Sequence, residues 1–593
     1  MFGRTAEMVV DVSDVPGGVV VFKLFKTALS PPLATRIAVI GAVGSTPISA
    51  RASVTLNYQW KVLEIFTGYY SHFNACCDAG RTLAYQTNAS FLATPITDDL
   101  LFPPLYFTAA LVGQPGSTVT APTIRRTMPA FVPGNRVELL VDGDKILASL
   151  LPALAAAQHH VHLNWFFFAT VSDVSTALQA CAARGVEVRL LFDQVATAMP
   201  EPLGQGIAPG EFLDGMNALT AAGVKIATSG LLVPPLDNLT TVTDPEYRER
   251  LEVQKVAARA IATRYGGLYA MTALRIRTEA EILGGIPRAL QEVFKSARDF
   301  GSAGLASPFL LGGCRDHTKL IIIDGTIAYC GGANGQRYYL YQDPIDPARD
   351  IDEEIADPAT TEKWDKWHDA FVRIEGPVVR DAQRCFAERW AVCAGEYLSR
   401  TSLDYFPAPQ NRGNVSVKVV ANIPGLERDI AAEYLRLFRN ATQQIRIENP
   451  YVTDDLIAIF IAHAAQIRQV PVELIVPDKH LDLAPARELM KARWDSLRAA
   501  GVQIYAYNNH MLHVKVATAD NLTSIVGSYN FAKSSADQLF EFGVVIQNAA
   551  FAAEVQQQLF DVDRPVSQQV TTDVSPDWTT FKASQMRFVD RIV

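Results

Sequence analysis

Two stretches of the chain carry a histidine, a lysine and an aspartate at the same spacing, H-x-K-x4-D. The six residues are His317, Lys319 and Asp324 in HTKLIIID, and His513, Lys515 and Asp520 in HVKVATAD. An imidazole can attack the phosphorus of a phosphodiester to form a phosphohistidine, and a second imidazole can protonate the departing alkoxide. Lysine ammonium groups can hold the nonbridging oxygens, where negative charge gathers in the transition state. The two stretches therefore contain the residue types that a site for phosphodiester cleavage would need.

The repetition continues beyond these six residues. A glycine follows each aspartate by seven residues (Gly331, Gly527) and an asparagine follows three residues later (Asn334, Asn530), so the copies keep an offset of 196 residues. Either stretch alone is also compatible with a His-Lys pair at a strand edge that has no catalytic duty. Two matching copies favour an internal duplication in which neither half forms a complete site alone.

Other polar groups in the duplicated segments are candidates for binding the phosphate. We expect Asn334 and Asn530, together with the two lysines, to hold the nonbridging oxygens. Ser528 and the backbone of Gly332 are weaker candidates for the same role. The scheme requires no metal ion and no cofactor, and the sequence shows no cluster with metal-ligand spacing.

The surrounding sequence predicts the elements that position these residues. The residues inside each motif are apolar and β-prone, so each motif is expected at the start of a strand, where His and Lys project from one face. Further strands are predicted at 136–141, 161–169, 186–193, 415–420, 445–452 and 472–478, separated by helical stretches. This alternation predicts an α/β fold, internally duplicated, with two halves related by a pseudo-twofold axis and mainly parallel sheets.

Composition changes divide the chain into three regions. Residues 1–130 are rich in β-prone runs broken by Pro and Gly, which predicts a β-rich accessory region; an extended arm over the catalytic body is the alternative. The first half is expected at 131–408 and the second half at 409–593. The run DPIDPARDIDEEIAD in the first half is interpreted as a solvated acidic loop rather than a cation site.

The first half contains an insertion, at about 196–310, that the second half lacks. Because it directly precedes His317, we expect it to form a wall that selects the nonreacting groups of the diester, with the apolar segment LLVPPL within 228–240 as its centre. A packing elaboration that only enlarges the core is an equally good interpretation.

Four segments, RDHTKLIIIDG, GGAN, WHDAFVRIEGPVV and GSYNFAKSS, resemble segments of the phospholipase D superfamily, whose mark is two HKD motifs. The likeness covers about residues 131–560. It implies that His317 is the nucleophile, while His513 acts first as general acid and then as the base for water or an alcohol. Members often carry Arg before the serine that follows the second Asn, whereas this chain has Ser534-Ser535.

The same resemblance assigns roles to the carboxylates. Asp369, before AFVRI, and Glu541, before FGVVI, hold equivalent places and are expected to orient the two histidines. The motif aspartates Asp324 and Asp520, although part of the catalytic motifs, are expected to support the site structurally.

The remaining histidines, cysteines and aromatic residues have ordinary structural interpretations. His159, His160 and His162 are interpreted as surface or core residues rather than metal ligands, and the seven cysteines as reduced thiols. The aromatic run Trp165-Phe166-Phe167-Phe168 is assigned to the core in preference to an acyl-chain pocket.

The overall charge and hydropathy bear on partners and location. A net charge of −9 makes nucleic acid an improbable partner, because such binding rests on Lys and Arg. The chain has no apolar run of 18 residues, and its N-terminus lacks the apolar region of a Sec signal. We therefore expect a cytoplasmic protein or one exported by a specialised secretion route.

Phospholipid at a membrane surface is the substrate that these features favour, with water or an alcohol as acceptor. A nuclease or another nonlipid phosphodiesterase is the first alternative, and it should concentrate Lys and Arg along the cleft. Exchange of the cardiolipin synthase kind ranks lower, because such members usually carry N-terminal membrane helices. A noncatalytic binding protein would normally have lost a motif residue, and none is missing.

Overall fold

The duplication appears directly in the order of the strands. The computed structural model describes residues 129–169, 172–193, 209–229, 315–423, 427–537 and 539–574, together with seven strands within the first 125 residues. The first sheet has the order β11 (Lys225–Ser229), β10 (Glu187–Asp193), β9 (His160–Trp165), β13 (Leu320–Ile323), β14 (Ile327–Gly331), β15 (Ala370–Glu375) and β8 (Val132–Val141). The second sheet has the order β20 (Gln503–Tyr507), β19 (Val472–Pro477), β18 (Ile445–Glu448), β21 (Val516–Ala519), β22 (Thr523–Gly527), β23 (Leu539–Gln547) and β16 (Val415–Ile423).

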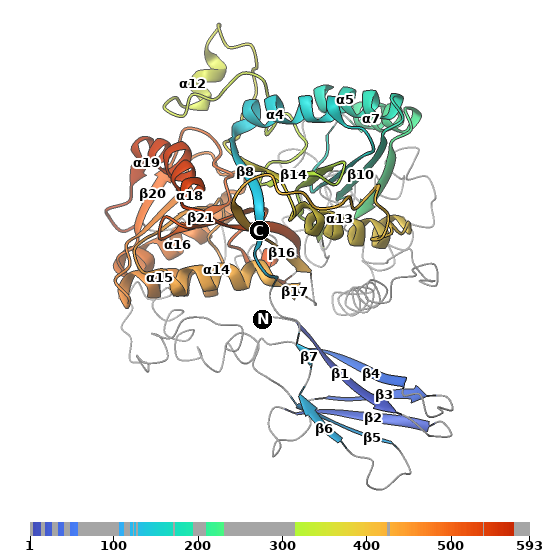
Figure 1. The fold of residues 1–593 in the computed structure, drawn as a ribbon. Coiled ribbons are helices and arrows are strands. Elements are labelled where there is room, and N and C mark those ends of the chain that lie inside the picture. Colours follow the sequence, from blue (N-terminus) through green and yellow to red (C-terminus); the bar gives the residue numbers. More distant parts are fainter. Residues whose placement is uncertain are drawn as a thin grey trace, which may run out of the picture.

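The two sheets meet at their equivalent edge strands. β8 pairs antiparallel with β16, and this contact lies near the middle of the body in Figure 1, between the first half (cyan to yellow) and the second half (orange to red). An antiparallel pair of equivalent strands is what a twofold relation between the halves requires. The predicted α/β duplication is therefore confirmed.

The prediction of mainly parallel sheets is wrong. Among the described residues, parallel pairing within each sheet is confined to β9, β10 and β11 in one half and to β18, β19 and β20 in the other. The short strand β12 also pairs in parallel with β23 of the opposite half. The strand-helix alternation that suggested parallel pairing ends at each motif. From there a short turn joins β13 to β14 and β21 to β22, and strands joined by so short a turn can pair only antiparallel.

Helices follow the strands in the same order in both halves. The first half contains α4 (Asp142–Ala156), α5 (Ser172–Ala183), α7 (Pro209–Ala221), α12 (Ile351–Ala356) and α13 (Val379–Ala394). The second contains α14 (Asp429–Asn440), α15 (Asp455–Gln466), α16 (Ala484–Ala499), α17 (Lys533–Asp537), α18 (Ala549–Val555), the π-helix η2 (Gln556–Phe560) and α19 (Asp561–Val566). Short strands β12 (Arg315–Asp316), β17 (Glu427–Arg428) and β24 (Gln568–Gln569) complete the body. No helix among the described residues combines the length and apolar character needed to cross a bilayer.

Three apolar clusters form the core, and one of them belongs to both halves. One lies between the first sheet and α4, α5 and α7, and a second between the other sheet and α14, α15 and α16. The third combines Leu139 and Leu320 from the first sheet with Val417 and Val544 from the second. Because apolar burial is the main favourable term in folding, this shared cluster resists separation of the halves.

The N-terminal region is β-rich, as predicted. One antiparallel sheet contains β4 (Ile48–Leu56), β1 (Arg4–Val12) and β7 (Ile124–Arg125). A second contains β3 (Ala34–Ile40), β2 (Gly18–Phe25), β5 (Tyr106–Leu111) and β6 (Val119–Pro122).

The insertion in the first half begins later than predicted. α7 and β11 lie within the predicted range of 196–310, yet they occupy the places that α16 and β20 occupy in the second half. Both elements therefore belong to the fold that the halves share. The residues that have no counterpart in the second half begin only after Ser229. The wall predicted around 228–240 falls almost wholly in 230–314, outside the described residues.

The acidic run is not simply solvated. Its helix α12 begins at Ile351, which is buried and donates its backbone N–H to the carbonyl of Asn509, 2.8 Å away in the second half. Glu354 is also buried and forms a salt bridge of 2.9 Å with Lys366. The half-buried Asp350 and the exposed Asp352 both contact Lys479, which supplies the positive charge that a cation would otherwise bring.

The motif aspartates hold the backbone of neighbouring segments. Asp324 follows β13 with φ of +52°, and its carboxylate accepts hydrogen bonds from the backbone N–H groups of residues 158–160, at 2.7–2.9 Å. Asp520 follows β21 with φ of +56° and accepts from the N–H groups of residues 442–444. Each aspartate thus fastens the turn after its motif to the segment that precedes the neighbouring strand, β9 or β18.

We predict that Asp324→Ala and Asp520→Ala lower stability rather than remove chemistry. Each change leaves several backbone N–H groups without their acceptor, which should cost about 1–2 kcal/mol. Thermal unfolding should show a lower midpoint for both variants, with turnover of the folded protein kept within a few fold. Asp352→Ala, whose side chain is 70% exposed, is the control and should unfold like the parent. A variant with normal unfolding but lost turnover would show that the aspartate acts directly.

Candidate active site

Each motif histidine is anchored to the opposite half through its backbone. His317 donates its N–H to the carbonyl of Phe540 at 2.8 Å, where β12 runs beside the start of β23. His513 donates its N–H to the carbonyl of His368 at 2.7 Å. Phe540 and His368 each directly precede one of the predicted orienting carboxylates. The backbone frame is therefore the same on both sides of the site.

The histidine side chains are paired crosswise with those carboxylates. Nδ1 of His317 lies 2.9 Å from Oε2 of Glu541, and Nδ1 of His513 lies 2.7 Å from Oδ2 of Asp369. All four side chains are buried. A carboxylate on Nδ1 fixes the ring and the tautomer, so that Nε2 remains for a reacting atom. The crossed arrangement was not predicted, because it depends on how the halves dock.

The two lysines lie beside their own histidines. Nζ of Lys319 donates to the carbonyl of His317 at 2.9 Å, and Nζ of Lys515 donates to that of His513 at 2.6 Å. Nζ of Lys515 also lies 2.9 and 3.0 Å from the two ring nitrogens of His513. Burial lowers the pKa of Lys515 to about 8 and that of Lys319 well below its usual value. The ammonium groups are thus poorly hydrated and suited to meet an anion.

Burial also governs the proton affinities of the two crossed pairs. It lowers the pKa of His317 and of His513 well below 6.5, and the nearby lysines lower both further. Burial raises the pKa of Asp369 to about 7 and that of Glu541 to about 8. These directions favour neutral imidazoles whose proton lies between Nδ1 and the carboxylate. An uncharged Nε2 atom is what a nucleophile needs.

The two asparagines differ in their hydrogen bonds more than the two histidines do. Oδ1 of Asn334 accepts from the backbone N–H of Phe167 at 3.3 Å, and the Asn334 side chain also bonds to the hydroxyl of Tyr339. Asn530 is buried, and within the described residues its Oδ1 atom has no hydrogen-bond partner. Both remain candidates for binding phosphate oxygens through their amide groups.

Gly332 and Ser528 do not have the phosphate-binding role predicted for them. The N–H of Gly332 is used by the carbonyl of Ala370 at 3.1 Å, and a Cβ atom on this glycine would lie 2.1 Å from Oδ1 of Asp369. The hydroxyl of Ser528 donates to Glu541 and accepts from the N–H of Phe542 at 3.0 Å. The two residues occupy equivalent positions in the halves. Each lies against an orienting carboxylate. Gly332 leaves space for Asp369, and Ser528 donates a hydrogen bond to Glu541.

Ser535 is a further site residue that the sequence reasoning missed. Its hydroxyl donates to Oε1 of Glu541 at 2.6 Å, so two serines hold this carboxylate. The signal was present, because Ser535 lies in GSYNFAKSS at the point where the chain departs from the family pattern.

Aromatic side chains surround both histidines. The ring of Phe166 meets His317 edge-on at 4.7 Å between centroids, and Nζ of Lys319 lies 5.0 Å from the same ring. Tyr339 and Trp367 lie 5.1 and 5.3 Å from the ring of His513. The aromatic run was assigned to the core, which is correct for Trp165, Phe166 and Phe168, whereas Phe167 is half-buried. Apolar rings at this place limit access of water to the site.

The three histidines near the start of β9 lie in the core or at the surface. His160 and His162 are buried, burial lowers the pKa of His160 to about 4, and the ring of His162 stacks on Phe386 at 4.5 Å. His159 is exposed. The four described cysteines are free thiols.

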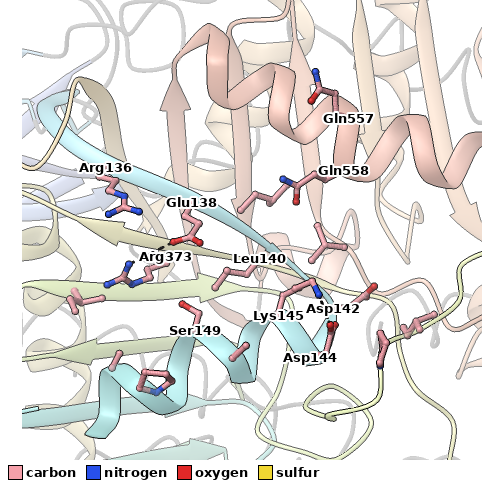
Figure 2. Close-up of a pocket in the computed structure, with 18 of the residues that line it drawn as sticks. Arg136, Glu138, Leu140, Asp142, Asp144, Lys145, Ser149, Arg373, Gln557 and Gln558 are labelled. Atoms are coloured by element: carbon pink, nitrogen blue, oxygen red, sulfur yellow. Dashed lines mark hydrogen bonds and ion pairs between the residues drawn. The ribbon is translucent and has the colours of Figure 1, made fainter. Parts of the chain in front are cut away.

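A separate groove lies outside this site. It has a volume of about 1150 Å³ and is bordered by β8, α4, Arg373 and the glutamines of η2 (Figure 2). Arg136, Glu138, Asp142, Asp144 and Lys145 give it a mixed charge. None of the motif residues lines it, so the groove is not where the motif histidines act.

The chain is similar to several known proteins. The family model described as cardiolipin synthase, PLD-like domain, matches residues 434–562, which contain the second motif. The major cardiolipin synthase ClsA of Bacillus subtilis is 26% identical over 283 residues, which are 47% of this chain and 55% of that protein. Cardiolipin synthase A of Erwinia tasmaniensis is 24% identical over 436 residues, 72% of this chain and 68% of that protein. Among solved structures, phosphatidylserine synthase of Haemophilus influenzae aligns with a TM-score of 0.47 and 12% identity, covering 78% of this chain and 97% of that one.

The match thus spans about half the length of the Bacillus relative and about two thirds of the Erwinia relative. Both intact motifs, the family model matched over residues 434–562 and these relatives support assignment of the chain to the phospholipase D superfamily.

Proposed function

We propose that this chain is a phosphatidyltransferase of the phospholipase D type. It cleaves the head-group phosphodiester of a phospholipid through a phosphohistidine and passes the phosphatidyl group to an alcohol or to water. The observation that carries the proposal is the crossed pairing of His317 with Glu541 and of His513 with Asp369, flanked by two buried lysines. Two imidazoles oriented in this way can act in turn on opposite faces of one phosphorus atom.

In the first step, Nε2 of His317 forms a bond to phosphorus while the bond between phosphorus and the head-group oxygen breaks. His513 gives its proton to that oxygen, so the leaving group departs as a neutral alcohol. The ring of His317 becomes cationic as the N–P bond forms, and the carboxylate of Glu541, 2.9 Å from Nδ1, stabilises it. In the second step, His513 removes a proton from the acceptor hydroxyl. The acceptor oxygen then bonds to phosphorus and the N–P bond breaks.

Substrate charge accounts for the proton that His513 must hold. In the free site, Lys515 and Lys319 lower the pKa of His513. A phosphodiester anion placed against the two ammonium groups offsets their charge, so its binding raises the pKa of His513. The site would therefore acquire its general acid when substrate binds. The lysines then stabilise the charge that develops on the nonbridging oxygens.

The choice of acceptor is supported by the relatives and by the aromatic surroundings. Taken alone, the sequence ranks cardiolipin-type exchange below other reactions of phospholipids, but the relatives that it matches are named cardiolipin synthases. Rings of Phe166, Tyr339 and Trp367 beside the histidines favour an alcohol over bulk water. We therefore place transfer to an alcohol, such as a glycerol hydroxyl of a second phospholipid, ahead of hydrolysis.

The substrate class can be tested by incubating the purified chain with vesicles of phosphatidylglycerol, phosphatidylethanolamine and phosphatidylcholine, and in parallel with DNA. We expect exchange or release of a lipid head group and no cleavage of DNA. Cleavage of DNA without change in any lipid would replace the proposal by a nuclease function.

We predict that His317→Ala and His513→Ala each lower turnover at least ~10³-fold, because nucleophile and acid act as a unit. Mass spectrometry of a trapped intermediate should find the phosphoryl adduct on His317. His159→Ala, which removes an exposed histidine next to β9, is the matched control and should keep full activity. An adduct on His513 would exchange the two roles, and full activity of either motif variant would end the scheme.

Turnover of a soluble short-chain phospholipid should survive exhaustive chelation of divalent metals. The reason is that two buried ammonium groups already supply the positive charge that phosphoryl transfer needs. A soluble substrate is required because calcium can alter a lipid surface without contacting the site. Loss of turnover with EDTA, and its return with one divalent ion, would contradict this prediction.

A further inference from the structure

His368, the residue before Asp369, is held by carboxylates on both of its ring nitrogens. Nδ1 lies 2.7 Å from Oδ1 of Asp142 and Nε2 lies 3.0 Å from Oδ2 of Asp563. The side chain is 2% exposed. With an acceptor on each nitrogen, both nitrogens carry a proton and the ring is an imidazolium. Although burial lowers the pKa of His368, the two carboxylates raise it well above 6.5.

Other ionisable groups lie around His368 and its two carboxylates. Glu448 is fully buried beside Asp563, and burial raises its pKa well above the usual range. The imidazolium has no lone pair left for a metal ion. Five titratable groups face His368, namely Asp142 on α4, Asp563 on α19, Glu448 on β18, Tyr507 on β20 and His510. Lys515 and Lys319 face the neighbouring Asp369.

His368 and Asp142 also fix the backbone around Asp369. His368 accepts the N–H of His513 at 2.7 Å and donates its own N–H to the carbonyl of Met511 at 2.9 Å. Asp142 donates its N–H to the carbonyl of Asp369 at 2.8 Å, and its Oδ1 atom accepts the N–H of Asp369 at 3.2 Å. Asp142 has φ of +71°, a conformation that persists in a non-glycine residue only when its surroundings enforce it.

The other half has the same backbone frame without this cluster. The residue before Glu541 is Phe540, and the guanidinium of Arg389 lies 3.5 Å from the centre of its ring. Arg389 in turn bonds to Asp316 at 2.9 Å. The position before the orienting carboxylate therefore holds an imidazolium behind His513 and an uncharged ring behind His317. The two crossed pairs share the bond between Nδ1 and a carboxylate and differ in what lies behind that carboxylate.

We propose that His368 is a positioning residue that acts through Asp369, keeping this carboxylate ionised and in place for His513. This inference rests on the proposed function, in which His513 is the general acid and base. Asp142, the partner on Nδ1, also lines the groove of Figure 2 and is 16% exposed, so it links the buried cluster to solvent. His368 thereby makes the two motif histidines chemically inequivalent.

The direction of the pH effect follows from the charge. Burial already raises the pKa of Asp369 to about 7, and the positive charge of His368 opposes that rise. When the charge is removed, Asp369 holds its proton to higher pH and no longer accepts from Nδ1 of His513. The acid limb of the pH profile, where protonation of this carboxylate ends activity, should therefore move to higher pH.

The test uses the full chain with His368→Phe, which copies the residue found in the other half, and with Asp563→Asn, which keeps the shape of the cluster. We expect His368→Phe to lower turnover at pH 7 by about 10–100-fold and to move the acid limb of the pH profile up by about one unit. Activity should recover toward that of the parent at pH 9. Asp563→Asn should move the limb in the same direction and less far, and it covers the case in which His368→Phe does not fold.

His162→Gln is the matched control, because it removes another fully buried imidazole, whose ring nitrogens contact Gln383 and Arg189. Its acid limb should stay where the parent's lies. A uniform loss of activity in His368→Phe and Asp563→Asn with an unmoved limb would overturn the positioning role. Stoichiometric divalent metal in the purified protein, lost in Glu448→Gln, would also overturn it in favour of a metal site. Retained activity in His513→Ala would instead defeat the proposed function itself.

Discussion

The bonds between each motif histidine and a carboxylate of the opposite half are the constraint on which the structure depends. Buried carboxylates and imidazoles are costly unless each has a partner. Here the partners meet only when the halves are docked, because Glu541 reaches His317 and Asp369 reaches His513 across the interface. The pairing of β8 with β16 and the apolar cluster common to both sheets hold that arrangement. Folding of the body and assembly of the site are therefore one event.

Much of the site follows from sequence because the same short motif occurs twice. The spacing of His and Lys on one strand determines that both side chains face the same way, and the resemblance to a family identifies the two carboxylates. The crossed pairing could not be deduced, since it depends on which sheet edges meet. The roles of Gly332 and Ser528 were misassigned for a related reason. Glycine and serine beside an asparagine suggest a phosphate cradle, whereas their neighbours in space are Asp369 and Glu541.

The fold was less predictable after each motif than before it. Strand-helix alternation up to the motif correctly indicates an α/β layer, but it contains no information on the direction of the strands that follow. Those directions are set by the turns at Asp324 and Asp520, where an aspartate in the left-handed region closes a hairpin and accepts three backbone N–H groups. The motif aspartate thus explains both the antiparallel strands and why this residue recurs in each copy.

A duplicated site must still give its two histidines opposite tasks. A nucleophile has to offer a bare nitrogen at the moment when its partner holds a proton, and two identical environments would titrate identically. The direct contacts differ in part, because Lys515 also lies beside the ring nitrogens of His513 and two serines bond to Glu541. A further difference lies one layer out, where Arg389 covers Phe540 on one side and two carboxylates bond to His368 on the other. Divergence at that distance changes proton affinity without disturbing the contacts that both steps share, so a duplication can specialise its halves while the motifs stay intact.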